Sequence, residues 1–190
     1  MSELIVFNSV SMDGFFVDNQ GDMRWAHNST KDEEWDAFVE SNASGGGVLV
    51  FGRITYELMN SYWPTPFAMQ AYPVVAERMN NLPKIVFSRT LDRATWNNTR
   101  LVKDGMAAEI RKMKGGSGTD MVILGSGSIV SQLTHERLVD EYQIVVIPVI
   151  LGKGRALFES INQTQKAKLI KSRVFTNGNV LLCYKPTPPG

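Results

Sequence analysis

The segment 125–128, with the sequence Gly-Ser-Gly-Ser, combines residue types that could bind a phosphate. It follows the apolar run 121–124, and apolar residues then recur at helical spacing. A buried strand, a glycine joint and a helix N-terminus together predict free backbone amides and a positive dipole that an anion can approach closely. The dinucleotide fingerprint requires a third glycine, but Val130 stands at that position. An ordinary strand-to-helix turn therefore stays an alternative.

Two further strand ends carry arginine. The pair Gly52-Arg53 follows the apolar run 48–51, and the pair Ser88-Arg89 follows the run 84–87. Ligands of parallel sheets bind at the carboxyl ends of strands, and the forked guanidinium group suits phosphate oxygens. A solvated surface arginine is the alternative for Arg53, because the helix dipole disfavours a cation at a helix start. The second pair is also an ordinary loop sequence.

The elements that must position these residues follow an α/β pattern. Short apolar runs alternate with helical patterns up to about residue 147, and a hairpin signal follows at Asn177-Gly178. The alternation predicts a mostly parallel central sheet with helices on both faces and an antiparallel C-terminal hairpin. We predict one domain over residues 1–185, a Pro-rich tail at 186–190, and a long loop rich in large side chains at 13–28.

Composition excludes several classes of function. The apolar fraction of 43%, the charged fraction of 21% and the formal net charge of +1 are ordinary for a globular protein and indicate neither a nucleic-acid nor a membrane partner. The N-terminal residues show no signal-peptide pattern, and the longest apolar run is too short to cross a bilayer. We therefore expect no signal peptide and a cytoplasmic protein. The single cysteine, Cys183, excludes an internal disulfide and a multi-cysteine metal site, and we expect no metal.

Four motifs occur in an informative order along the chain. They are Ser-Met-Asp-Gly at 11–14, Gly-Arg-Ile-Thr-Tyr-Glu at 52–57, Gly-Ser-Gly at 125–127, and Pro-Val-Ile-Leu-Gly-Lys-Gly-Arg-Ala-Leu-Phe at 148–158. In this combination the chain resembles the dihydrofolate-reductase-like family, close to the reductase domain of the bifunctional deaminase-reductase of bacterial riboflavin biosynthesis. The last motif is the most specific, and the resemblance covers nearly the whole chain. It implies a three-layer αβα sandwich, NADPH as hydride donor and a homodimer.

The resemblance also implies where the cofactor binds. By the family's pattern NADPH would contact Gly52, Arg53, Thr55, Ser88, Arg89, Gly125, Ser126, Gly127 and Ser128. The second arginine lies where the family often contacts the 2′-phosphate, and two arginines at strand ends favour NADP over NAD. The implied function is NADPH-dependent reduction of a pterin or ribosylaminopyrimidine type of heterocycle. A non-catalytic NADP- or pterin-binding protein and a flavin-dependent enzyme are the alternatives.

The substrate side is less defined than the cofactor side. We take Asp13 and Asp32 as candidate catalytic residues, acting as an acid or a substrate anchor, and Phe16, Trp25 and Trp35 as candidate substrate-binding residues. Each has a structural alternative. Asp13 fits a turn, Asp32 belongs to the helix-capping pattern at 30–33, and aromatic side chains at such positions often pack in a core.

Overall fold

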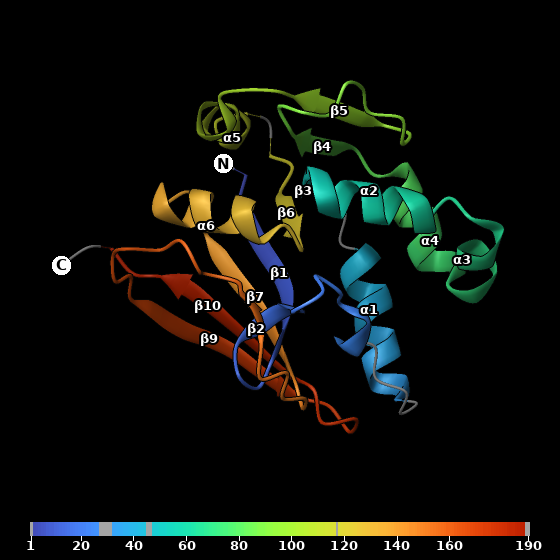
Figure 1. Cartoon of the computed structure of the whole chain (residues 1–190), viewed down its shortest axis with the longest axis vertical. Coiled ribbons are helices and arrows are strands. Elements are labelled where there is room, and N and C mark those ends of the chain that lie inside the picture. The colour runs from blue at the N-terminus through green and yellow to red at the C-terminus, as the bar shows by residue number, and fades with distance from the viewer. Residues whose placement is uncertain (1, 27–31, 45–46, 117, 189–190) are drawn as a thin grey trace.

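The computed structural model describes residues 2–26, 32–44, 47–116 and 118–188. Its main sheet contains the strands, in spatial order, β5 (Thr99–Val102), β4 (Lys84–Phe87), β3 (Val48–Gly52), β6 (Met121–Leu124), β1 (Leu4–Ser11), β7 (Glu141–Ile147), β10 (Val180–Pro186) and β9 (Ala167–Val174). Neighbouring strands from β5 to β7 are parallel, whereas β10 runs antiparallel to β7 and β9. The predicted sheet and C-terminal hairpin are confirmed (Figure 1).

Helices cover both faces of this sheet (Figure 1). They are α1 (Glu33–Ser44), α2 (Arg53–Tyr62), α3 (Pro66–Ala71), α4 (Pro73–Asn81), α5 (Met106–Lys114) and α6 (Gly127–His135), with a 3₁₀ turn, η1, at Arg24–Ala26. A separate two-stranded sheet pairs β2 (Phe15–Asp18) with β8 (Gly154–Ala156). The three-layer α/β architecture is thus the observed one.

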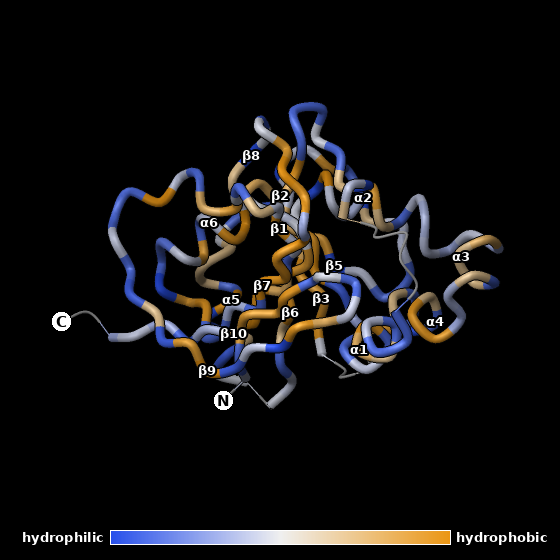
Figure 2. Tube along the Cα trace, turned by 90° about the horizontal axis from the view of Figure 1, so that it is seen from below, coloured by the Kyte–Doolittle hydropathy of each residue, from blue (hydrophilic) through white to orange (hydrophobic). Residues whose placement is uncertain are grey.

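The apolar strands form helix-facing clusters on both sides of the sheet. On one face, Ile110 of α5 and Leu133 of α6 pack with Val50 and Ile123, none of them exposed. On the other face, residues of α2 and α4 pack against β3 and β4, and aromatic residues of α1 pack against β7 and β10. Figure 2 shows the hydrophobic colour concentrated along the central strands. Because both faces are covered, these strands read as continuous apolar runs rather than alternating ones.

Two local details differ from the sequence-based expectations. The predicted loop at 13–28 contains β2 and η1, because β2 pairs with a strand more than a hundred residues later in the chain. Ordered contacts also pass the boundary set at 185: Pro186 closes β10, and Thr187 N donates to Lys166 O.

Candidate functional site

A cleft of about 1600 Å³ opens at the carboxyl ends of β3, β4 and β6, beside the β2–β8 pair. It brings together eight of the nine predicted cofactor residues, namely Gly52, Arg53, Thr55, Ser88, Arg89, Ser126, Gly127 and Ser128. Gly125 lies against Thr55 at the start of the same joint. Residues separated by more than seventy positions in the sequence therefore meet at one edge of the sheet, as the strand-end argument predicts.

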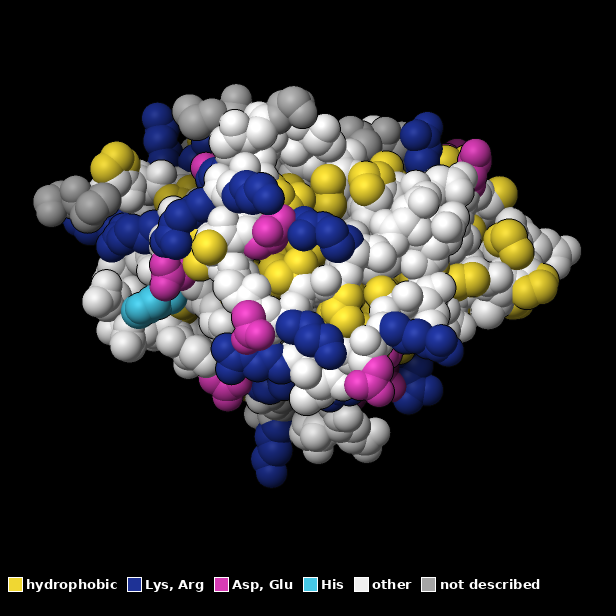
Figure 3. Space-filling model, turned by 90° about the horizontal axis from the view of Figure 1, so that it is seen from above, with side chains coloured by type: hydrophobic (Ala, Val, Ile, Leu, Met, Phe, Trp, Pro, Cys, Tyr) yellow, Lys and Arg dark blue, Asp and Glu magenta, His cyan; other side chains and the backbone are white. Residues whose placement is uncertain are grey.

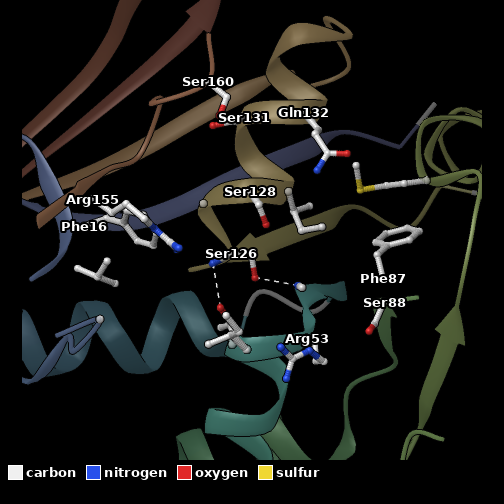
Figure 4. Close-up of a pocket in the computed structure, with 18 of the residues that line it drawn as sticks. Phe16, Arg53, Phe87, Ser88, Ser126, Ser128, Ser131, Gln132, Arg155 and Ser160 are labelled. Atoms are coloured by element: carbon white, nitrogen blue, oxygen red, sulfur yellow. Dashed lines mark hydrogen bonds between the residues drawn. The ribbon is translucent and has the colours of Figure 1, made fainter. Parts of the chain in front are cut away.

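Ser126 ties the two helix starts of the cleft together. Its backbone N donates to Thr55 Oγ1 at 3.0 Å, and its Oγ accepts from Gly52 N at 3.0 Å, as the dashed lines in Figure 4 show. The same hydroxyl donates to Leu124 O at 3.0 Å. Two of these three hydrogen bonds link the start of α6 to the start of α2, and the third holds the serine against the end of β6. It is therefore a positioning residue for both helix N-termini.

The joint between β6 and α6 uses two consecutive left-handed residues. Gly125 has φ +57°, and Ser126 has φ +56°. A non-glycine residue in this region costs energy unless its surroundings hold it there. Here the three hydrogen bonds of Ser126 do so. Strain of this kind is often retained at ligand-binding sites.

Both helices present uncapped N-termini to the cleft. Neither Gly52 before α2 nor Ser126 before α6 makes a side-chain capping hydrogen bond. In α6 the first intrahelical donor is Ile129 N, which donates to Ser126 O, so the amides of Gly127 and Ser128 precede the helical hydrogen-bond ladder. Such amides, together with the helix dipoles, favour a bound anion.

Basic residues line the cleft, and several of them pair with carboxylates. Arg53 Nη1 contacts Glu57 Oε2 at 2.9 Å, and Arg89 Nε contacts Asp104 Oδ1 at 2.9 Å. Figure 3 shows a face of the molecule on which Lys and Arg side chains alternate with acidic ones around exposed hydrophobic side chains. These ion pairs are exposed and therefore weak, so a phosphate can replace the carboxylate at low cost.

Asp13 lies outside the lining of the cleft and holds two loops together. Its carboxylate accepts hydrogen bonds from Ser11 Oγ at 2.6 Å, from Leu151 N at 3.1 Å and from Gly152 N at 2.7 Å. The bond from Ser11, followed by those from Gly152 and Leu151, lowers the pKa of Asp13 below its usual value. A general acid needs a raised pKa, so the contacts of Asp13 fit loop anchoring better than proton donation.

Asp32 is likewise outside the lining of the cleft and is the N-terminal cap of α1. Its Oδ1 accepts from Glu34 N and Trp35 N, each at 3.0 Å, and its Oδ2 accepts from Asn177 N at 2.9 Å. The hydrogen bond from Trp35 N has the largest of the effects that lower the pKa of this buried carboxylate. The capping alternative thus accounts for Asp32, although Thr30 and Lys31 of the predicted capping pattern lie outside the described residues.

The lowered pKa of Asp32 predicts a sensitivity to acid. The pKa of Asp32 in the folded protein lies below the usual 3.8. The ionised carboxylate therefore stabilises the folded state above pH 3.8, and this contribution is lost as pH falls through the folded-state pKa. Asp32→Asn should therefore be less stable than the native protein at neutral pH. The difference between their free energies of unfolding should become smaller at acidic pH. Urea unfolding of both proteins at neutral and acidic pH measures this. Asp36→Asn, an exposed carboxylate of the same helix, is the control, and a gap independent of pH would contradict the assignment.

The three candidate substrate aromatics separate into two environments. Phe16 lines the cleft, with its ring against Gly127 at the start of α6: a Cβ built on that glycine would lie 2.5 Å from Phe16 Cζ. Trp25 and Trp35 instead pack between α1 and the strands β7 and β10, where Trp35 meets Phe175 edge to face at 5.0 Å. The structure therefore places only Phe16 of the three among the lining residues.

Several lining residues had no role assigned from the sequence. Lys103 directly follows β5, so the strand-end criterion could have found it. Lys153 and Arg155 lie in the motif at 148–158, but nothing local links that motif to the cleft; only the pairing of β8 with β2 brings it there. Within the described ranges no group of three or more His, Cys, Asp or Glu residues could hold a metal ion. No described helix is long and apolar enough to cross a bilayer.

Comparisons with known proteins agree with this architecture. Residues 2–181 match the model of the RibD C-terminal domain. The protein YyaP of Bacillus subtilis (strain 168) is 26% identical over 181 residues, covering 95% of this chain and 93% of that protein. YwjB of the same organism is 24% identical over 173 residues, covering 90% and 91%.

Two solved structures share the fold. A protein from Shewanella sp. PV-4 titled "Putative riboflavin biosynthesis protein" superimposes with a TM-score of 0.77 at 24% identity, covering 98% of this chain and 99% of that one. The diaminohydroxyphosphoribosylaminopyrimidine deaminase/5-amino-6-(5-phosphoribosylamino)uracil reductase of Thermotoga maritima gives a TM-score of 0.68 at 14% identity. In that case the match covers 98% of this chain but 57% of the larger protein.

Proposed function

This chain belongs to the RibD C-terminal domain family, and from that premise we propose that it is an NADPH-dependent reductase of a small heterocycle of pterin or ribosylaminopyrimidine type. The observation that carries the proposal is the cleft itself, in which two uncapped helix N-termini and two arginines converge at strand ends. The reductase named among the similar structures supports the reaction class. NADPH supplies a hydride from its nicotinamide ring when bound.

The residues of the cleft fit a dinucleotide phosphate. The amides of Gly127 and Ser128 and the start of α2 would hold the pyrophosphate, because these donors have no helical acceptor. Arg53, in the first turn of α2, would add a fixed charge, and Arg89 after β4 would bind the 2′-phosphate. Within the proposal, the work of this chain is to bind and orient its ligands; the contacts of Asp13 and Asp32 support no proton-transfer step.

Removal of the Arg89 side chain tests the 2′-phosphate assignment. We expect Arg89→Ala to weaken NADPH binding roughly tenfold to hundredfold, because a charge-assisted hydrogen bond is lost, while NADH affinity stays within about twofold. Fluorescence titration with both nucleotides measures the two dissociation constants. Arg93→Ala, an exposed arginine of the same loop outside the cleft lining, is the matched control. Equal losses for both nucleotides would contradict the assignment, and no binding of NADPH by the native protein would sink the cofactor proposal.

A non-catalytic nucleotide-binding protein is the second candidate. The observation that favours it is that both candidate catalytic carboxylates are occupied by backbone amides outside the lining of the cleft. NADPH oxidation assayed with a panel of pterins and aminopyrimidines separates the two functions. Turnover of any substrate in the panel supports the reductase, whereas tight NADPH binding with no turnover across the panel supports the binding protein.

We also propose that the protein is a homodimer. The strands β7 and β10 lie inside the sheet, so neither offers a free edge to a second copy. The edge strand β9 instead exposes Leu169, Ile170 and Val174, which favours this edge as the contact.

A further inference from the structure

The β2–β8 pair places one more arginine beside the start of α6. Arg155 lies on β8, opposite Val17 of β2, and the register shifts between Phe15 and Val17. This irregularity leaves Phe16 outside the regular pairing, and its buried ring fills the space that a side chain at Gly127 would occupy. The small sheet is thereby held against the first residue of α6.

The guanidinium group of Arg155 lies over the ring of Phe16. The Arg155 Cζ atom lies 5.3 Å from the centre of the Phe16 ring, which is a cation–π distance. Figure 4 shows the two side chains together at the edge of the cleft, with Ser126 and Ser128 of the α6 start beside them. Stacking on a ring leaves the in-plane N–H groups of a guanidinium free to bind a ligand.

The charge environment of Arg155 differs from that of the other arginines of the cleft. Arg53, Arg89 and Arg111 each contact a carboxylate. No ion pair of Arg155 is found among the described residues, although its exposed side chain lines the cleft. A cation without a counter-charge beside the positive end of α6 is electrostatically unfavourable, and an anion bound between them would relieve both charges.

We propose that Arg155 is a phosphate-binding residue of the cleft, held in position by Phe16, that binds a phosphate group seated at the start of α6. The inference rests on the proposed function, under which this phosphate is the pyrophosphate of NADPH. A phosphate carried by a phosphosugar substrate would present the same chemistry. The two sources differ in which ligand loses affinity when the arginine is removed.

The test compares Arg155→Ala with the native protein in titrations with NADPH, NADH and ribose 5-phosphate. If the cofactor's pyrophosphate is the ligand, both nucleotides should lose affinity by a similar factor, roughly tenfold to hundredfold, so their ratio is preserved. If a substrate phosphate is the ligand, ribose 5-phosphate alone should lose affinity. Unchanged affinity for all three would overturn the inference while leaving the reductase proposal intact.

Two further variants separate ligand binding from structure. Arg173→Ala is the matched control, because Arg173 also stacks on an aromatic ring, that of Phe175 at 4.8 Å, but pairs with Glu34 away from the cleft. It should leave all three affinities unchanged. Phe16→Leu keeps an apolar side chain but removes the aromatic face, and it should reproduce part of the loss seen in Arg155→Ala. If the native protein binds no NADPH, the proposed cofactor is wrong, and the ribose 5-phosphate titration alone then decides the role of Arg155.

Discussion

Lys84→Met is expected to lower the free energy of unfolding by about 2–4 kcal/mol while leaving NADPH affinity unchanged. Lys84 is 2% exposed on β4, and its Nζ donates to the carbonyl oxygens of Asn80 at 3.0 Å, Leu82 at 2.7 Å and Asn97 at 3.1 Å. The first two acceptors lie at the end of α4, where carbonyls have no helical donor. Methionine matches the length of the side chain but leaves three carbonyls without this donor.

Urea unfolding measures this loss, and Lys112→Met on α5, an exposed lysine, is the control expected to have little effect. A small loss in both variants would show that water satisfies the three carbonyls.

The same lysine predicts an unusual dependence of stability on pH. Burial lowers the pKa of Lys84 from 10.5 to about 8. Between these values the unfolded chain binds more protons than the folded one, so the contribution of Lys84 to stability increases as pH rises. The difference in stability between the native protein and Lys84→Met should therefore grow by roughly 1–2 kcal/mol from about pH 7.5 to about pH 9.5. A difference that shrinks over this range would contradict the lowered pKa.

Gly125→Ala is expected to lower stability by about 2–4 kcal/mol and also to weaken NADPH binding at least roughly tenfold. The residue has φ +57°, which disfavours any side chain, and a Cβ there would lie 2.9 Å from Thr55 Cγ2 and 3.1 Å from Thr55 Oγ1. Because Thr55 Oγ1 accepts the hydrogen bond from Ser126 N, displacement of Thr55 would separate the starts of α2 and α6. Thermal unfolding and NADPH titration measure the two effects.

A second substitution distinguishes the steric contribution from the backbone strain. Thr55→Ser removes the Cγ2 methyl group but keeps the hydroxyl, so in the Gly125→Ala background it should restore part of the stability and of the affinity. Gly115→Ala at the end of α5 is the control, since its φ is −76° and the nearest atom to a new Cβ is 3.6 Å away. No recovery in the double variant would mean that backbone strain alone causes the loss.

The sequence by itself determined the layered fold and predicted most of the residues that line the cleft at the strand ends. The local patterns are continuous apolar runs, each followed by a short polar segment: Gly52-Arg53, Ser88-Arg89 or Gly125-Ser126-Gly127. Because the strands are parallel, their carboxyl ends lie at one edge of the sheet. The resemblance carried by the four motifs then gave these patterns a common interpretation, and the family match over residues 2–181 confirms that resemblance.

Only the tertiary structure decided what the remaining candidates contact. Asp32 is a capping residue whose second oxygen is taken by Asn177 N, 145 positions along the chain, and Trp25 and Trp35 pack in a core cluster rather than in the cleft. Arg155 reaches the cleft because a three-residue strand pairs with β2 across most of the chain. The periodic spacing of apolar residues in a helix or strand reflects contacts between residues a few positions apart. The partner of a carboxylate or a guanidinium is instead set by contacts between segments that are distant in the sequence, and local spacing does not encode these contacts.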